Sequence, residues 1–201
     1  MVKSVLCKFG VSRSSWVVGS VVLAGAIAAI AASGIAGLAV AKTSGSDRSI
    51  ASSQAKQAKA VEQEILAAHN KYRKEVGVPD LTWSPTLAAH AQAWADQLAS
   101  TGKFDHSTDP HGEGENLAKG TVRADRAAEL VGLWGGEKQY FQPGTFPDVS
   151  TTGNWMDVGH YTQLVWRDTT QVGCGVATGG GSTVLVCRYS PPGNYEGEPV
   201  Y

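Results

Sequence analysis

The chain has 201 residues, with 17 Lys and Arg against 18 Asp and Glu, so its formal net charge is −1. This length allows one or two domains. The near-neutral balance, with scattered basic residues, excludes the clustered positive charge typical of nucleic-acid-binding proteins, and we expect no nucleic-acid partner. Five of the six Trp residues lie beyond residue 80, which places the expected core in the C-terminal part.

Residues 1–41 have the pattern of an export segment. Three basic residues and no acidic residue precede residues 16–41, which contain no charged side chain. This order is typical of a signal peptide, and Ala39-Val40-Ala41 fits a cleavage site. The run is also long enough to span a bilayer, so a retained anchor is the alternative. Both interpretations place the rest of the chain outside the cytoplasm, with membrane contact only through residues 16–41.

Local signals predict the first helices. Residues 42–60 are small and polar and are expected to form a flexible linker, whose end can extend the next helix. Apolar residues at helical spacing predict a first helix over residues 61–75. A second helix is expected to begin with Ser84 as N-cap and Pro85 at its first position, and to end at Gly102.

The remaining elements follow from changes in composition and period. A Gly-, Asp- and His-rich loop is expected over residues 103–120, and Asp125 can cap a third helix that runs to about residue 140. A short helix is predicted over residues 159–166. Alternation at 172–176 and β-branched residues at 183–189 predict two strands joined by a Gly-rich turn. Helices combined with antiparallel strands indicate an α+β fold.

Two of the three cysteines fall on neighbouring arms of the predicted hairpin. Cys174 and Cys187 can form a disulfide if their Cα atoms lie about 4.4–6.8 Å apart. Export to an oxidising compartment favours that bond. Two buried free thiols are the alternative.

Polar residues in apolar surroundings are the candidates for chemistry. Glu137 shares a helix face with Leu130 and Trp134, so its carboxylate must reach solvent or a partner. A residue at the rim that extends to water is the alternative. His160 opens the segment GHYTQLVW, where it can serve as a cap, a ligand, a base or a structural residue.

The loop FDHSTDPHGEGENL holds further candidates. His106 and Glu115 lie there, interleaved with His111 and Glu113. Neither pair has a strong metal-binding spacing such as H-E-x-x-H, and a solvated turn is an equally good explanation of the composition.

Several segments together resemble the CAP superfamily of cysteine-rich secretory, antigen 5 and pathogenesis-related 1 proteins. They occur in the family's order over about 140 residues, and the likeness is nearest to single-domain members of the pathogenesis-related 1 type. The segments are HNKYR at 69–73, LTWSPTLAAHAQAWA at 81–95, HST…GENLA at 106–118, GHYTQLVW at 159–166 and CRYSPPGNY at 187–195. The domain is expected to span residues 61–201.

The resemblance implies a three-layer α-β-α sandwich with a mainly antiparallel central sheet. It also implies a cleft lined by two His and two acidic residues, which by motif are His106, Glu115, Glu137 and His160. Such a set suits a divalent metal such as zinc.

The resemblance further implies an exported binding module for a hydrophobic or sterol-like ligand, or a factor acting at envelopes or on a host. The alternative is a metal-dependent, peptidase-like hydrolase in which Glu137 or His160 acts as general base on water. We favour binding because no catalytic motif such as G-x-S-x-G occurs, and we leave enzymatic activity open. A wall- or envelope-attached structural protein is a third possibility if residues 16–41 are retained. We expect a monomer.

Overall fold

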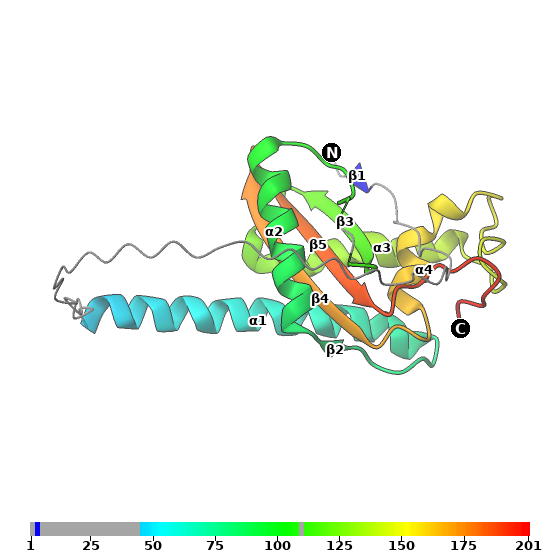
Figure 1. The fold of residues 1–201 in the computed structure, drawn as a ribbon, viewed down its shortest axis with the longest axis horizontal. Helices are drawn as coiled ribbons and strands as arrows, with labels where there is room; N and C mark the ends of the chain where they lie inside the picture. The colour runs from blue at the N-terminus through cyan, green and yellow to red at the C-terminus, as the bar shows by residue number, and fades with distance from the viewer. Residues whose placement is uncertain (1–2, 5–44, 109–110) are drawn as a thin grey trace, which may run out of the picture.

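The computed structural model describes residues 3–4, 45–108 and 111–201 (Figure 1). Its helices are α1 (Gly45–Glu75), α2 (Pro85–Thr101), α3 (Val131–Gly136) and α4 (Gly159–Val165), with 3-10 helices η1 (Ala124–Leu130), η2 (Glu137–Tyr140) and η3 (Trp155–Asp157). Its strands are β1 (Lys3–Ser4), β2 (Thr82–Trp83), β3 (Gly114–Gly120), β4 (Gln171–Gly179) and β5 (Ser182–Ser190).

The predicted export segment lies outside the described residues, apart from the two residues of β1. Among the helices that the structure describes, none combines the length and apolar character needed to cross a bilayer.

The five strands form one mixed sheet in the order β1-β3-β5-β4-β2. All neighbouring strands are antiparallel except β2 and β4, which are parallel. Helix α2 covers one face of the sheet, and α1, α3 and α4 lie across the other (Figure 1). The expected three-layer α-β-α arrangement with a mainly antiparallel sheet is therefore confirmed.

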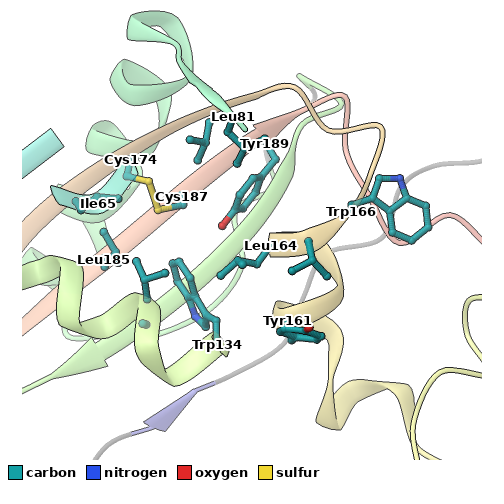
Figure 2. Close-up of a cluster of buried hydrophobic side chains, with 14 of the residues drawn as sticks. Ile65, Leu81, Trp134, Tyr161, Leu164, Trp166, Cys174, Leu185, Cys187 and Tyr189 are labelled. Atoms are coloured by element: carbon teal, nitrogen blue, oxygen red, sulfur yellow. A yellow bond between two sulfur atoms is a disulfide. The ribbon is translucent and has the colours of Figure 1, made fainter. Parts of the chain in front are cut away.

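The strands divide their side chains between two cores, as the two-residue period of a strand requires. On the α2 face, Leu117 and Val186 pack with Ala95 of α2. On the opposite face, Ala118 and Leu185 join the larger cluster around the α1, α3 and α4 helices. Figure 2 shows part of this larger core, in which Ile65, Trp134 and Tyr189 surround the disulfide between β4 and β5.

Glycines of β4 allow α2 to lie directly on the strand. A Cβ atom built on Gly173 would collide with backbone atoms of Ser84, Leu87 and Ala88, and one built on Gly175 would collide with the backbone of Gln92. These glycines were expected only as the alternate residues of a strand. Their function is to remove side chains from the α2 contact.

The predicted disulfide between Cys174 and Cys187 is present and is buried. The two residues are opposite each other in the β4–β5 register, with Cα atoms 4.1 Å apart, slightly closer than the range expected from the sequence. The cross-strand pairing that the hairpin predicted therefore holds.

Local capping signals gave the bounds of α2 correctly. The Ser84 hydroxyl accepts a hydrogen bond from the Leu87 N–H at 3.4 Å, and Gly102 ends the helix in the left-handed conformation at φ 70°. Only Gly or Asn adopts that conformation readily, which is why a glycine marks the helix end.

Three local expectations differ from the structure. Helix α1 begins at Gly45, so residues 45–60 are helical although they were expected to form a flexible linker. The expected third helix is divided into η1, α3 and η2, and no side chain caps its start. Strand β3 lies where a loop was expected. The division of the chain at residue 60 stays a prediction.

Candidate functional site

His106 forms a short contact with Glu115, which links the loop after α2 to strand β3. The distance from His106 Nδ1 to Glu115 Oε1 is 2.6 Å, and the backbone N–H of Ser107 donates to the same oxygen at 3.0 Å. The other oxygen, Oε2, lies 3.0 Å from Nη2 of buried Arg188, which is opposite Glu115 in the β3–β5 register. Glu115 is therefore held by an imidazole, a peptide group and a guanidinium.

These contacts keep the Glu115 carboxyl ionised in a buried position. Burial alone would raise its pKa, but the hydrogen bond from His106 and the charge of Arg188 outweigh burial and lower the pKa below its ordinary value. An ionised carboxylate only accepts hydrogen bonds, so His106 donates from Nδ1. In the neutral form of this ring, the lone pair is then on Nε2.

His160 forms the corresponding contact with Glu137. His160 lies in the first turn of α4, and its Nδ1 is 2.6 Å from Oε1 of Glu137, the first residue of η2. The Oε2 atom accepts the backbone N–H groups of His160 and Tyr161, both at 3.0 Å. The first N–H groups of a helix have no acceptor within the helix, so Glu137 caps α4 from a distant element.

Neighbouring side chains connect the two pairs. Asn116, which follows Glu115 in β3, donates from Nδ2 to the backbone carbonyl of His160 at 3.1 Å. The indole of Trp134 stacks on the His160 ring, with centroids 6.3 Å apart and an interplanar angle of 10°. The four predicted residues, which we call the tetrad, thus come from the loop after α2, strand β3, η2 and α4: His106, Glu115, Glu137 and His160.

The residue types of the tetrad suit a divalent metal held through imidazole nitrogens, but no three of the tetrad's donor atoms lie within 4.8 Å of one another in the structure. His106 Nε2 is buried and has no hydrogen-bond partner among the described residues. A neutral imidazole nitrogen is a typical zinc ligand, and a carboxylate on the opposite ring nitrogen is the usual outer-shell support. The contacts of Glu115 and Glu137 indicate support of the rings. Direct coordination by all four side chains stays a prediction.

A different set of donor atoms in the core is not a metal site. His69, Cys174 and Cys187 are the one group among the described residues with three donor atoms within 4.8 Å of one another. The sulfur atoms are bonded to each other, so neither is the thiolate that binds metals.

Both ring nitrogens of His69 are also occupied. Nδ1 lies 2.8 Å from the carbonyl oxygen of Ile65, which can only accept, so Nε2 accepts the Tyr189 hydroxyl at 2.9 Å. Burial is the main cause that lowers the pKa of His69 to about 4, which keeps the ring neutral. This residue supports the core rather than a ligand.

The structure adds residues that the sequence did not indicate as part of the site. Arg188 supports Glu115, Ser107 donates a backbone N–H, and Asn116 connects β3 to α4. The signal for Arg188 was a charged residue inside an otherwise apolar strand, TVLVCRYS. Such a residue needs a buried partner of opposite charge.

A cavity of about 320 Å³ lies away from the tetrad, between α1, η1 and β4. Its apolar lining includes Val61, Ile65, Trp83 and Val176, together with the disulfide-bonded Cys174. Five glutamine or acidic residues complete the wall: Gln54, Gln57, Glu62, Gln92 and Asp125. The cavity thus combines an apolar interior with polar groups.

Known proteins match this chain in sequence and in fold. The profile of the CAP family, described as the cysteine-rich secretory protein family, matches residues 66–189. Pathogenesis-related protein 1A of Nicotiana tabacum is 45% identical over 142 residues, which cover 70% of this chain and 80% of that protein.

Solved structures agree with this sequence match. A structure of NaASP2 with Zn2+ is 25% identical, with a TM-score of 0.59, and the match covers 71% of this chain and 85% of that one. Na-ASP-1 is 27% identical, with a TM-score of 0.60, and the match covers 71% of this chain but only 41% of that protein. From its sequence and its fold, the chain belongs to the cysteine-rich secretory protein (CAP) family.

Proposed function

We propose that this protein is an exported binding module that takes a hydrophobic ligand, with a tetrad able to hold a divalent metal. The observation that carries the proposal is the cavity between α1, η1 and β4. Its volume of about 320 Å³ is within the range of small-molecule pockets, roughly 300–1,000 Å³. Such pockets are mostly apolar with a few polar groups that orient the ligand.

The lining favours a ligand with an apolar body and a polar head, such as a fatty acid or a sterol. Trp83, Val61 and Val176 offer apolar area. Gln92 already donates to the Val176 carbonyl and accepts from the Val176 N–H, both at 2.9 Å, so this wall is held rigidly. A rigid wall lowers the ordering cost of binding.

Filling the cavity tests the proposal. Val176→Trp is expected to weaken binding of a fluorescent fatty acid or sterol probe at least about tenfold, since the indole would occupy ligand volume. Thr178→Trp is the matched control, because Thr178 is exposed on the same strand and outside the cavity lining. Equal probe binding by wild type and Val176→Trp would remove the hydrophobic-ligand proposal.

The metal part of the proposal rests on the two imidazole–carboxylate pairs. The relative crystallised with Zn2+ supports zinc as the probe. His106→Ala and His160→Ala are each expected to lower zinc affinity in calorimetric titration without unfolding the domain. Unchanged affinity in both folded variants would contradict a tetrad metal site.

Hydrolysis is the alternative function, favoured by the 2.6 Å contact between Glu137 and His160. A carboxylate that orients an imidazole is a frequent arrangement in general-base catalysis. A peptidase screen of the purified protein decides between the functions. Turnover that wild type shows and Glu137→Gln lacks, with the variant still folded, would place hydrolysis above binding.

Export is supported by the disulfide, which is typical of oxidising compartments, and by the secretory family to which the chain belongs. N-terminal sequencing of the mature protein distinguishes a cleaved signal peptide from an anchor. Lys42 as the new N-terminus would exclude the anchor.

A further inference from the structure

We propose that His90, His111 and Glu113 form a second binding site for a divalent transition metal, separate from the tetrad. His90 lies in α2, and the other two residues lie in the segment that leads into β3. We call these three residues the outer triad. The sequence singled out His111 and Glu113 only as neighbours of the tetrad candidates, and the proposed function uses none of the three.

The outer triad already brings two imidazoles and a carboxylate together. His90 Nδ1 lies 2.9 Å from Glu113 Oε1. The His90 and His111 rings are stacked, with centroids 4.1 Å apart and an interplanar angle of 8°. Imidazole nitrogens and a carboxylate oxygen are ligands that divalent transition metals bind in proteins.

The spacing of His90 and Glu113 suits two ligands of one ion. Metal–nitrogen and metal–oxygen bonds of about 2.0–2.2 Å place adjacent ligand atoms roughly 3 Å apart. An ion bound by both side chains would replace the His90–Glu113 hydrogen bond, with a turn of the imidazole that directs its Nδ1 lone pair at the ion.

His111 completes the set by turning its ring. Parallel rings cannot both direct a nitrogen at one ion, and the three donor atoms do not lie within 4.8 Å of one another in this structure. His111 is exposed and stacks on His90, so metal binding by all three side chains requires its ring to leave this stack and turn toward the His90–Glu113 pair. The predicted ligand set is two imidazole nitrogens and one carboxylate oxygen, which suits zinc, nickel or copper.

Burial and charge also favour a cation here. The side chains of His90 and Glu113 are 30% and 10% exposed, so an ion has access to the site but is partly screened from water. Arg188 lies 3.5 Å from Glu113 and 3.0 Å from Glu115, and its charge balances one of these two carboxylates. The other carboxylate leaves one net negative charge next to the two imidazoles.

The five histidines of the chain make the site testable. His69 is saturated in the core and His106 and His160 belong to the tetrad, which leaves His90 and His111. In the His106→Ala, His160→Ala background, calorimetric titration with zinc alone is expected to show one remaining equivalent. Adding His90→Ala or His111→Ala should weaken that binding at least about tenfold.

Asp96→Asn, on the exposed side of α2, is the matched control and should leave the remaining equivalent unchanged. Absence of zinc binding in the folded His106→Ala, His160→Ala variant would overturn the outer triad. So would zinc binding that survives both His90→Ala and His111→Ala.

If the His106→Ala, His160→Ala variant does not fold, the exposed substitution His111→Gln in the otherwise intact chain decides. Loss of one zinc equivalent supports the site, and unchanged stoichiometry removes it. Failure of the tetrad alters neither result.

Discussion

The two imidazole–carboxylate pairs of the tetrad have the same length but different supports. In both pairs Nδ1 lies 2.6 Å from a carboxylate oxygen. The second oxygen of Glu115 faces the charge of buried Arg188, whereas that of Glu137 accepts two backbone N–H groups at the start of α4. One pair is thus fixed by a buried ion pair between strands, and the other by the end of a short helix.

The difference shows that one local arrangement can depend on unrelated parts of the fold. The His106 pair depends on the register between β3 and β5, since this register places Glu115 opposite Arg188. The His160 pair depends on how α3 and η2 lie against α4. Removing the support of each pair should therefore have different effects on the stability of the protein and on its zinc affinity.

The largest effect is expected for Glu115→Ala. Removal of this carboxylate takes away the shorter ion pair of the buried Arg188 guanidinium, which keeps the longer ion pair to Glu113 and the hydrogen bond to the Ser107 hydroxyl at 2.7 Å. Loss of one partner of a buried pair costs about 3–5 kcal/mol. Urea denaturation at pH 7 measures the loss. Glu113→Ala is the control and should cost less, because its contact with Arg188 is longer. An equal loss in both variants would contradict the ion-pair support of His106.

The second largest effect is a loss of stability at acid pH, caused by His69, the buried histidine without a carboxylate partner among the described contacts. Its pKa is lowered from 6.5 to about 4, so the unfolded chain binds a proton first as the pH falls. The contribution of His69 to the free energy of unfolding is therefore fully present above pH 6.5. It falls by up to about 3 kcal/mol as the pH drops from about 6.5 to 4.

Denaturation at a series of pH values tests this origin of the acid sensitivity. The His69→Gln variant should be less stable at pH 7 but should show a flatter pH dependence between pH 6.5 and 4.5. A variant that keeps the slope of the wild type would assign the acid sensitivity to other groups.

The smallest effect on stability is expected for Glu137→Gln. The amide oxygen can still accept one helix N–H, so the loss resembles that of a helix cap, about 1 kcal/mol. Zinc affinity should fall more, by about 10–100-fold, because the amide no longer fixes the Nδ1 proton of His160 as a carboxylate does. Thermal melting and calorimetry on one sample measure both. A stability loss as large as that of Glu115→Ala would contradict the different supports that we assign to the two imidazole–carboxylate pairs.

Elements with local signals were predictable from the sequence. Ser84, Pro85 and Gly102 act within one helical turn of the ends of α2, and the structure places both ends there. The apolar period that contains Trp134 led to Glu137, although the segment is not one continuous α-helix. The membership of His106 and His160 in one site came from the resemblance to the CAP family, not from spacing.

Features set by distant partners were not predictable. Strand β3 contains Gly114, Lys119 and Gly120, and its conformation comes from pairing with β5 about 70 residues later. The buried role of Arg188 depends on the same pairing. For residues 45–60, low hydrophobicity suggested a linker. Ala, Gln and Lys have high helix propensity, however, so this exposed part of α1 extends the packed part over residues 61–75 without a packing face of its own.

The cap that Glu137 places on α4 limits how the site can be transplanted. A designer who moves His106, Glu115 and Arg188 must reproduce a strand register, whereas moving His160 requires the first turn of a helix together with its remote carboxylate. The smallest unit that can be moved with His160 is therefore the start of its helix plus the Glu137 side chain from another helix. A library selected only for folded protein would already enrich an acid at position 137, before any ligand is supplied.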